Sequence, residues 1–270
     1  MDYVIVRGKK HKIGVYPDYT DFGLCSQGIK TLDEIEGLEE YANLRALDLG
    51  YNSLESIEGI EQFPILQYLR LPNNQLTDIS PLRHLTKLKS VELQNNKILD
   101  MSSLGNSPQI EYLNLTQNHT ENISGLECNS RLKELHLSYN KISTIDGLDA
   151  CINLKELSLM HNQISQIAGL ENLFNLEWRL DLSENRISRL NGVSHLTNLT
   201  ELYVSRNQIT EIEDLRGMIS LRVLDLYDNQ IRDISHVQFP PNLKYIEVDE
   251  DLIPKEQCDQ LYEKYEHIII

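Results

Sequence analysis

One asparagine position, repeated at a nearly constant interval, constrains this chain more than any other feature. It occurs at Asn52, Asn74, Asn96, Asn118, Asn140, Asn162, Asn185, Asn207 and Asn229. The interval is 22 residues throughout, except for 23 between Asn162 and Asn185. The pattern LxxLxLxxN includes each asparagine, and apolar residues about three positions apart follow it. This self-similarity predicts stacked units that share one core, because one unit alone cannot bury its apolar face.

The two halves of the repeat predict different local structures. In LxxLxLxx the alternation places Leu47 and Leu49 on one face of a short strand. The later three-residue spacing suits a 3₁₀ turn or a single helical turn that returns the chain. The asparagine amide is expected to satisfy buried backbone groups, each of which would otherwise cost about 1–3 kcal/mol.

The repeats resemble those of a known family. Segments such as NNQLTDISPLRHLTKLKSVELQNNKI are similar to leucine-rich repeats of the 22-residue class, and the resemblance covers about residues 22–253. That class includes the leucine-rich-repeat regulatory subunit of protein phosphatase type one and the internalin repeat domains. The resemblance implies an α/β solenoid, a horseshoe with a parallel concave β-sheet and a convex side of 3₁₀ and short helices.

We expect a single domain over residues 1–270, in three parts. Residues 1–43 form the N-terminal cap, 44–242 form nine repeats of 22 or 23 residues, and 243–270 form the last partial repeat and the C-terminal cap. Within the first part, residues 2–6 and 12–16 read as the strands of a β-hairpin around a turn at 7–10, and a degenerate repeat follows.

The C-terminal cap is expected to be helical. Pro254 is well placed to open a helix. Its apolar face is expected to consist of Cys258, Leu261, Tyr262 and Tyr265. The segment Ile268–Ile270 either packs on the last repeat, which we favour, or serves as a partner-binding tail.

Two irregularities interrupt the pattern. The 23-residue interval places an extra residue beside Trp178, which suggests a bulge. Trp178 would then lie at the surface near the concave face, or it would fill a gap at the core edge. In the fourth repeat, Ser107, Thr120 and Asn129 occupy positions where apolar residues are expected. This section is either packed less tightly or makes a local contact.

Composition excludes several classes of protein. The net charge of −16, from 41 acidic and 25 basic residues, argues against direct nucleic-acid binding, which needs a basic face. The sequence has neither an apolar run long enough to cross a membrane nor the pattern of a signal peptide. The four cysteines are far apart, which argues against a zinc site or a disulfide framework. We expect them to act as small buried apolar groups.

No catalytic motif is present, so we expect no enzyme activity and no cofactor. His136 and His161 occupy outward positions in adjacent repeats. They would form either a weak metal or proton site or, as we favour, a pair of solvated side chains.

The outward strand positions are the candidate binding surface. Seven of the 13 tyrosines lie there, although the core gives no reason for tyrosine at exposed sites. These tyrosines either serve binding, which we favour, or occur there because tyrosine is a good strand residue. Tyrosine and tryptophan anchor interfaces because they bury much area with few rotatable bonds. Acids outnumber bases at the same positions, which would favour a basic partner. The candidate partner-binding residues are Tyr51, Tyr68, Tyr112, His136, Tyr139, His161, Trp178, Asp181, Glu201, Tyr203, Asp225, Tyr227 and Tyr245.

Taken together, the sequence predicts a cytoplasmic protein-interaction module, with the nucleus as an alternative location. It would be a monomer that binds a protein with a basic surface, without membrane or direct nucleic-acid contact. The family resemblance suggests a regulatory subunit of a phosphatase-like enzyme. The alternatives are a scaffold of a cytoskeletal or nucleoprotein assembly and a secreted internalin-like adhesin.

Overall fold

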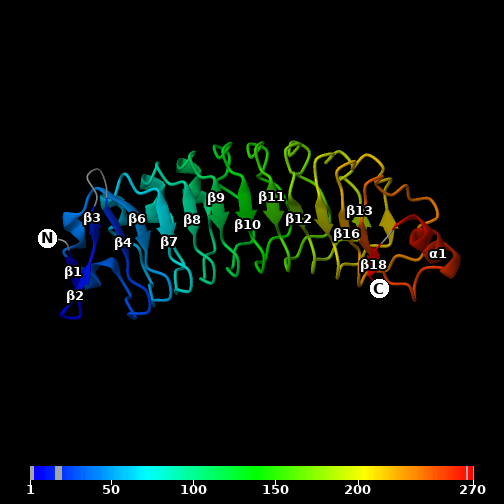
Figure 1. Ribbon diagram of the computed structural model, residues 1–270. Helices are drawn as coiled ribbons and strands as arrows, with labels where there is room; N and C mark the ends of the chain where they lie inside the picture. The colour runs from blue at the N-terminus through cyan, green and yellow to red at the C-terminus, as the bar shows by residue number, and fades with distance from the viewer. Residues whose placement is uncertain (1–2, 16–19, 266, 270) are drawn as a thin grey trace. The chain divides into compact units, whose positions relative to one another are not determined.

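A computed structural model describes residues 3–15, 20–265 and 267–269 (Figure 1). The chain forms two compact units, which divide between Leu132 and Lys133 and are called unit 1 and unit 2 below. Each unit is a run of parallel strands joined by return segments. The repeat solenoid predicted from the asparagine spacing is therefore confirmed.

Unit 1 opens with an antiparallel hairpin. Strand β1 (Tyr3–Val6) pairs with β2 (Lys9–Lys12), and β1 also pairs with β5 (Ile35–Glu36). Only Arg7 and Gly8 form the turn, and both have positive φ, at 51° and 76°. Two such residues make the tight turn that matches strand twist. The expected four-residue turn and second strand at 12–16 were wrong, and Asp2 and Tyr16 lie outside the described residues.

The degenerate first repeat already contributes to the main sheet of unit 1. Strand β3 (Gly14–Val15) pairs antiparallel with β4 (Thr20–Gly23), and β4 runs parallel to β6 (Leu44–Asp48). Three further parallel strands follow, which are β7 (Tyr68–Arg70), β8 (Ser90–Glu92) and β9 (Tyr112–Asn114).

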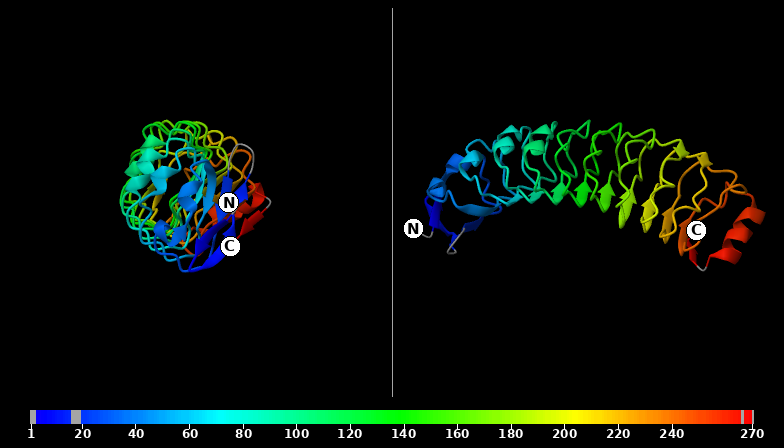
Figure 2. Two further views of the ribbon diagram at one scale, coloured as in Figure 1. Left: turned by 90° about the vertical axis from the view of Figure 1, so that its left-hand side faces the viewer. Right: turned by 90° about the horizontal axis from the view of Figure 1, so that it is seen from above.

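Short 3₁₀ helices form the return side of unit 1, as the three-residue apolar spacing predicts. They are η1 (Leu32–Glu34), η2 (Leu38–Glu40), η3 (Ile60–Gln62), η4 (Ser80–His84) and η5 (Ser102–Asn106). Each places its leucine or isoleucine in the core, as Leu82 and Leu104 illustrate with no exposed surface. Within this unit the helices lie on the side opposite the strands (Figure 2).

Unit 2 continues the pattern with parallel strands in register. They are β10 (Glu134–His136), β11 (Glu156–Ser158), β12 (Arg179–Asp181), β14 (Glu201–Tyr203), β16 (Val223–Asp225), β17 (Tyr245–Glu247) and β18 (His267–Ile269). Among the described residues of this unit, the return segments are turns rather than 3₁₀ helices. Two of them extend into the parallel pair β13 (Arg189–Leu190) and β15 (Glu211–Ile212), so that backbone groups are satisfied between adjacent repeats.

The repeated asparagines form a hydrogen-bonded ladder inside each unit. Asn207 shows the pattern: its Nδ2 donates to the carbonyls of Leu182 and Val204, at 2.9 and 3.0 Å. Its Oδ1 accepts the backbone N–H of Ile187 at 3.0 Å. Asn207 is only 8% exposed, so these bonds replace those that water would make. The ladder thus joins each repeat to the preceding one.

The polar residues of the fourth repeat are buried, and two of them join neighbouring repeats. Ser107 Oγ donates to the carbonyl of Leu85 at 2.7 Å, and Asn129 Nδ2 donates to the carbonyl of Ser107 at 3.0 Å. Ser107, Thr120 and Asn129 have no exposed surface. Of the two alternatives, the structure therefore supports a local contact in a well-packed core.

The cap at the end of unit 2 is helical, as predicted. Pro254 is the N-cap of α1 (Lys255–Lys264), and Cys258, Leu261 and Tyr265 are at most 6% exposed. The Tyr262 side chain lies outside the described residues.

Strand β18 follows the helix and runs parallel to β17, with Ile268 beside Ile246. The favoured prediction, that the tail packs on the last repeat, is thus confirmed for Ile268 and Ile269. Ile270 lies outside the described residues.

Candidate functional site

Two rows of side chains cover the outward face of the unit 2 sheet, and we call these twelve residues the strand face. Strand register aligns Glu134, Glu156, Arg179, Glu201, Val223 and Tyr245 in the first row. The second row consists of His136, Ser158, Asp181, Tyr203, Asp225 and Glu247. Six of these twelve side chains are carboxylates and only one is an arginine. The acidic excess predicted for the outward positions is thus present on the strand face.

A cation–aromatic cluster lies on β12 and β14. The Arg179 guanidinium donates to Asp181 Oδ2 at 2.9 Å and lies over the Tyr203 ring, 4.5 Å from its centroid. The Tyr203 hydroxyl donates to Glu201 Oε2 at 3.2 Å. Burial and then the Glu201 carboxylate raise the pKa of Tyr203. Each member of the cluster contacts another, although the buried Arg179 Nε has no hydrogen-bond partner among the described residues.

Asp181 differs from the expectation of an exposed charge. Only 4% of its surface is exposed, because Arg179 covers it and its Oδ1 accepts the N–H of Ser183 at 3.1 Å. Its carboxylate is therefore committed to contacts within the chain.

A hollow of about 220 Å³ lies beside this cluster, on β14, β16 and β17. We call it the Val223 hollow; it is lined by Tyr203, Val223, Leu224, Asp225, Tyr245, Ile246 and Glu247. Three predicted residues, Tyr203, Asp225 and Tyr245, meet here. Burial raises the pKa of Glu247, and the nearby Asp225 and Asp249 carboxylates raise it further.

A third row of unit 2 lies where each strand has turned toward its ladder asparagine. We call it the corner row: Tyr139, His161, Glu184, Arg206 and Asp228. All five have φ between 52° and 57°, the left-handed region that disfavours bulky residues. The backbone N–H of each of the first four donates to the next repeat, as His161 does to Ser183 at 2.9 Å. The left-handed turn is thus part of the repeat backbone.

Side chains of the corner row contact one another in sequence. The rings of Tyr139 and His161 stack with centroids 4.6 Å apart. His161 Nδ1 is 2.9 Å from Glu184 Oε2, and Arg206 donates to Glu184 Oε1 at 3.0 Å. The hydrogen bond from His161, followed by that from Arg206, lowers the pKa of Glu184.

The two histidines belong to different rows of unit 2 and each has its own carboxylate neighbour. His136 lies on β10 with its Nε2 3.7 Å from Glu134, whereas His161 belongs to the corner row. Among the residues that the structure describes, no cluster of three or more histidine, cysteine or acidic side chains is placed to hold a metal ion.

Trp178 and Tyr227 lie exposed at the borders of the strand face. Trp178 is 41% exposed and occupies a bend before β12, with Lys155 Nζ 5.2 Å from its ring. Of the two predicted positions for Trp178, the structure therefore supports the surface and not a gap at the core edge. The extra residue falls within the bend and leaves the pairing of Arg179 with Glu156 and Glu201 undisturbed. Tyr227 is 42% exposed.

The predicted tyrosines of unit 1 lie in separate repeats. Tyr51 is 63% exposed and has a φ of 56°, and Tyr68 on β7 is 38% exposed with Arg45 5.8 Å from its ring. Tyr112 on β9 is half-buried, and its hydroxyl accepts a bond from Asn114 Nδ2 at 3.3 Å.

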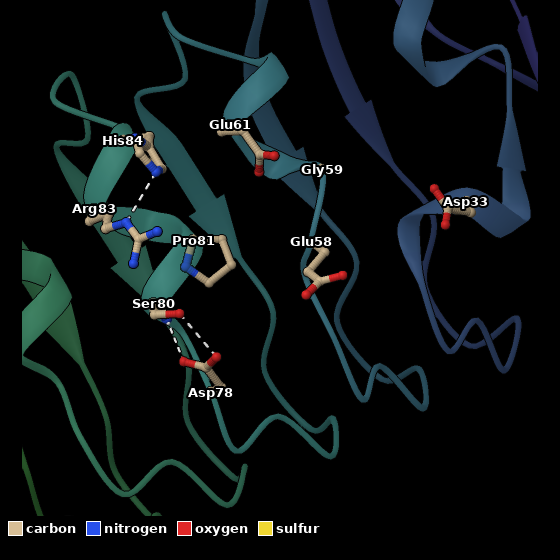
Figure 3. A pocket seen from close by; sticks show the side chains of 9 residues that line it. All are labelled: Asp33, Glu58, Gly59, Glu61, Asp78, Ser80, Pro81, Arg83 and His84. Atoms are coloured by element: carbon tan, nitrogen blue, oxygen red, sulfur yellow. Dashed lines mark hydrogen bonds between the residues drawn. The ribbon is translucent and has the colours of Figure 1, made fainter.

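A second hollow, of about 480 Å³, lies on the return side of unit 1 and includes none of the predicted residues (Figure 3). Asp78 accepts bonds there from the backbone and hydroxyl of Ser80, while Arg83 donates to His84. Its lining is polar and also includes the acidic residues Asp33, Glu58 and Glu61.

The cysteine prediction was partly wrong. All four thiols are free, but Cys25 and Cys128 are exposed, and only Cys151 and Cys258 are buried. None of the helices in the described part of the chain is long and apolar enough to cross a bilayer.

Sequence reasoning missed the Val223 hollow and the left-handed corner. Val223 is an apolar residue at an outward position, so it drew no attention as a candidate. The corner was detectable in principle, because two of the nine repeats carry asparagine there, at Asn73 and Asn95. Asparagine is enriched in left-handed conformations.

Comparisons with known proteins agree with this architecture. A family model described as leucine rich repeats (2 copies) matches residues 42–84, 64–106, 130–172 and 179–217. No curated protein matched the chain by sequence.

Several solved structures are similar to this chain. A leucine-rich-repeat protein of Leptospira interrogans is 27% identical with a TM-score of 0.76, over 86% of this chain and 62% of that one. The chain thus spans less than two thirds of that relative. An internalin of Listeria monocytogenes (inlF) is 23% identical, with a TM-score of 0.76 over 93% and 87% of the two chains, a likeness of fold. The plant peptide hormone receptor RGFR1, in complex with RGF2, is 25% identical with a TM-score of 0.65, over 78% and 37%.

Proposed function

Because the chain belongs to the leucine-rich-repeat family, we propose that it is a protein-interaction module whose working surface in unit 2 comprises the strand face and the corner row. The partner presents a basic segment to this surface. The plant receptor of similar fold, whose structure includes RGF2, supports a protein or peptide partner by analogy.

The corner row carries this proposal. A left-handed conformation costs about 1–2 kcal/mol for most residues, and asparagine or glycine would relieve it. Unit 2 nevertheless places Tyr139, Glu184 and Arg206 there. Asparagine or glycine would lower the backbone strain at these positions without changing the fold. The presence of other residues there therefore indicates that their side chains are needed.

The acidic residues of the strand face indicate that the partner carries positive charge. Glu134, Glu156, Glu201, Asp225 and Glu247 point to the same side as the half-exposed tyrosines. A negatively charged surface attracts a positively charged partner and increases the association rate. Salt weakens this attraction.

Charge reversal tests the proposal. Glu156→Lys with Glu201→Lys changes the strand face, whereas Asp146→Lys with Glu171→Lys makes the same net change on exposed return-side positions. Affinity purification with mass spectrometry should lose basic partners with the first variant and keep them with the second. Equal recovery with both variants would refute the use of this face.

The identity of the captured partner separates the narrower roles predicted from the sequence. A phosphatase-like enzyme would support a regulatory subunit, cytoskeletal or nucleoprotein components a scaffold, and a cell-surface protein an adhesin. We also propose a monomeric state and a cytoplasmic location, which light scattering and cell fractionation test.

A further inference from the structure

We propose that the Val223 hollow is a receptor for one arginine side chain of an extended partner segment. The inference rests on the proposed function, since it assigns a specific contact within the strand face. It concerns a site of about 220 Å³ on three adjacent strands, all within unit 2.

The neighbouring cluster shows how this surface holds a guanidinium. On β12, Arg179 donates to Asp181 at 2.9 Å and lies 4.5 Å from the Tyr203 ring centroid on β14. A carboxylate and an aromatic face together bind arginine well, because the planar fork matches the carboxylate and stacks on the ring.

The same carboxylate position recurs on β16 without the arginine. Asp225 occupies the register position of Asp181, but Val223 occupies that of Arg179. Valine is short, so the space that an arginine would fill is open. Among the described residues, neither Asp225 nor Glu247 forms an ion pair, although Asp225 Oδ1 accepts the N–H of Tyr227 at 3.1 Å.

The walls of the hollow suit the occupant. Tyr203 and Tyr245 offer ring surface on the two flanking strands, and Asp225 and Glu247 offer two carboxylates in adjacent register. Burial raises the pKa of Glu247, and repulsion from the Asp225 and Asp249 carboxylates raises it further. An incoming guanidinium would supply a positive counter-charge, and its bidentate geometry favours arginine over lysine.

Peptide titration of the full chain tests the inference. The probes are N-acetyl-Gly-Gly-Arg-Gly-Gly-amide and the same peptide with citrulline, which keeps the shape and removes the charge. Methyl NMR should show the arginine peptide shifting the Val223 signals saturably, with citrulline at least about tenfold weaker, since a charged hydrogen bond contributes about that factor. Equal binding of both peptides, or no shift at Val223, would overturn the proposal.

Variants locate the contact. Asp225→Asn with Glu247→Gln should abolish binding of the arginine peptide, whereas Asp146→Asn with Glu171→Gln, on the return side, should leave it unchanged. Val223→Phe keeps both carboxylates but fills the hollow, and it should also abolish binding. Retained binding in the Val223→Phe variant would overturn the assignment of the hollow.

The outcome is distinguishable from that of the proposed function. Partner capture that depends on Glu156 and Glu201, together with no arginine-peptide shift, would retain the interaction face and reject the arginine receptor. A saturable shift at Val223 without any captured partner would retain the arginine receptor and reject the proposed interaction face.

Discussion

Replacement of one ladder asparagine tests the physical basis of the repeat. In Asn207→Ala the buried N–H of Ile187 loses the acceptor Oδ1 at 3.0 Å, and Ile187 has no exposed surface. A buried donor without a partner costs about 1–3 kcal/mol.

Loss of the contacts from Asn207 Nδ2 to the Leu182 and Val204 carbonyls adds a smaller cost. Leu182 and Val204 each keep a second donor, from Asn185 and Asn229 respectively, at 3.0 Å in both cases. The bonds lost from Asn207 are therefore worth about 0.5 kcal/mol each, the low end for a neutral hydrogen bond. Together these contributions predict that the variant lowers the free energy of unfolding by about 2–4 kcal/mol.

Urea unfolding followed by circular dichroism measures the total, and hydrogen exchange at the Ile187 amide measures the local effect. The matched control is Asn175→Ala, which removes one exposed bond to the carbonyl of Ile152 and should cost less than about 0.5 kcal/mol. If the two variants are equally stable, or Ile187 stays protected from exchange, then the ladder does not hold the repeats as argued.

Two further predictions concern charge and backbone strain. Because the pKa of Glu247 is raised above its ordinary value of 4.5, its charged form destabilises the folded state, so the contribution of Glu247 to stability should fall as pH rises from about 4.5 through the folded pKa. Glu247→Gln should remove this slope and be more stable at pH 7 by about 0.2–1 kcal/mol, the scale of a cross-strand like-charge pair; a less stable variant would contradict the repulsion. Tyr51→Asn should raise stability by about 0.5–1 kcal/mol in thermal or urea unfolding, because Tyr51 has a φ of 56° and is 63% exposed; a loss of stability would show that its ring contributes packing.

The sequence predicts the repeat fold well because one signal is repeated nine times. Leucine alternation and the ladder asparagine act within 22 residues, so local pattern and global fold agree. The predicted position of the second hairpin strand was wrong because no repeated pattern marks that strand. The strand is KKHK, an exposed edge strand with no apolar alternation to reveal it.

Site residues were harder to predict than the fold because exposure depends on neighbouring strands. Asp181 is outward by pattern, yet Arg179 folds over it, a contact set by side-chain reach rather than spacing. The Val223 hollow arises from a small residue between larger ones on adjacent strands. Such a feature becomes visible only when strand register places Tyr203, Val223 and Tyr245 together.

The left-handed corner separates the residues that build the molecule from those available for recognition. Each corner of unit 2 from Tyr139 to Arg206 is anchored through its backbone N–H, whatever side chain it carries. A library randomised at Tyr139, His161, Glu184 and Arg206 would therefore retain the solenoid while altering the surface chemistry at one point in each of these repeats. Retargeting this chain to a new protein would begin with those four codons.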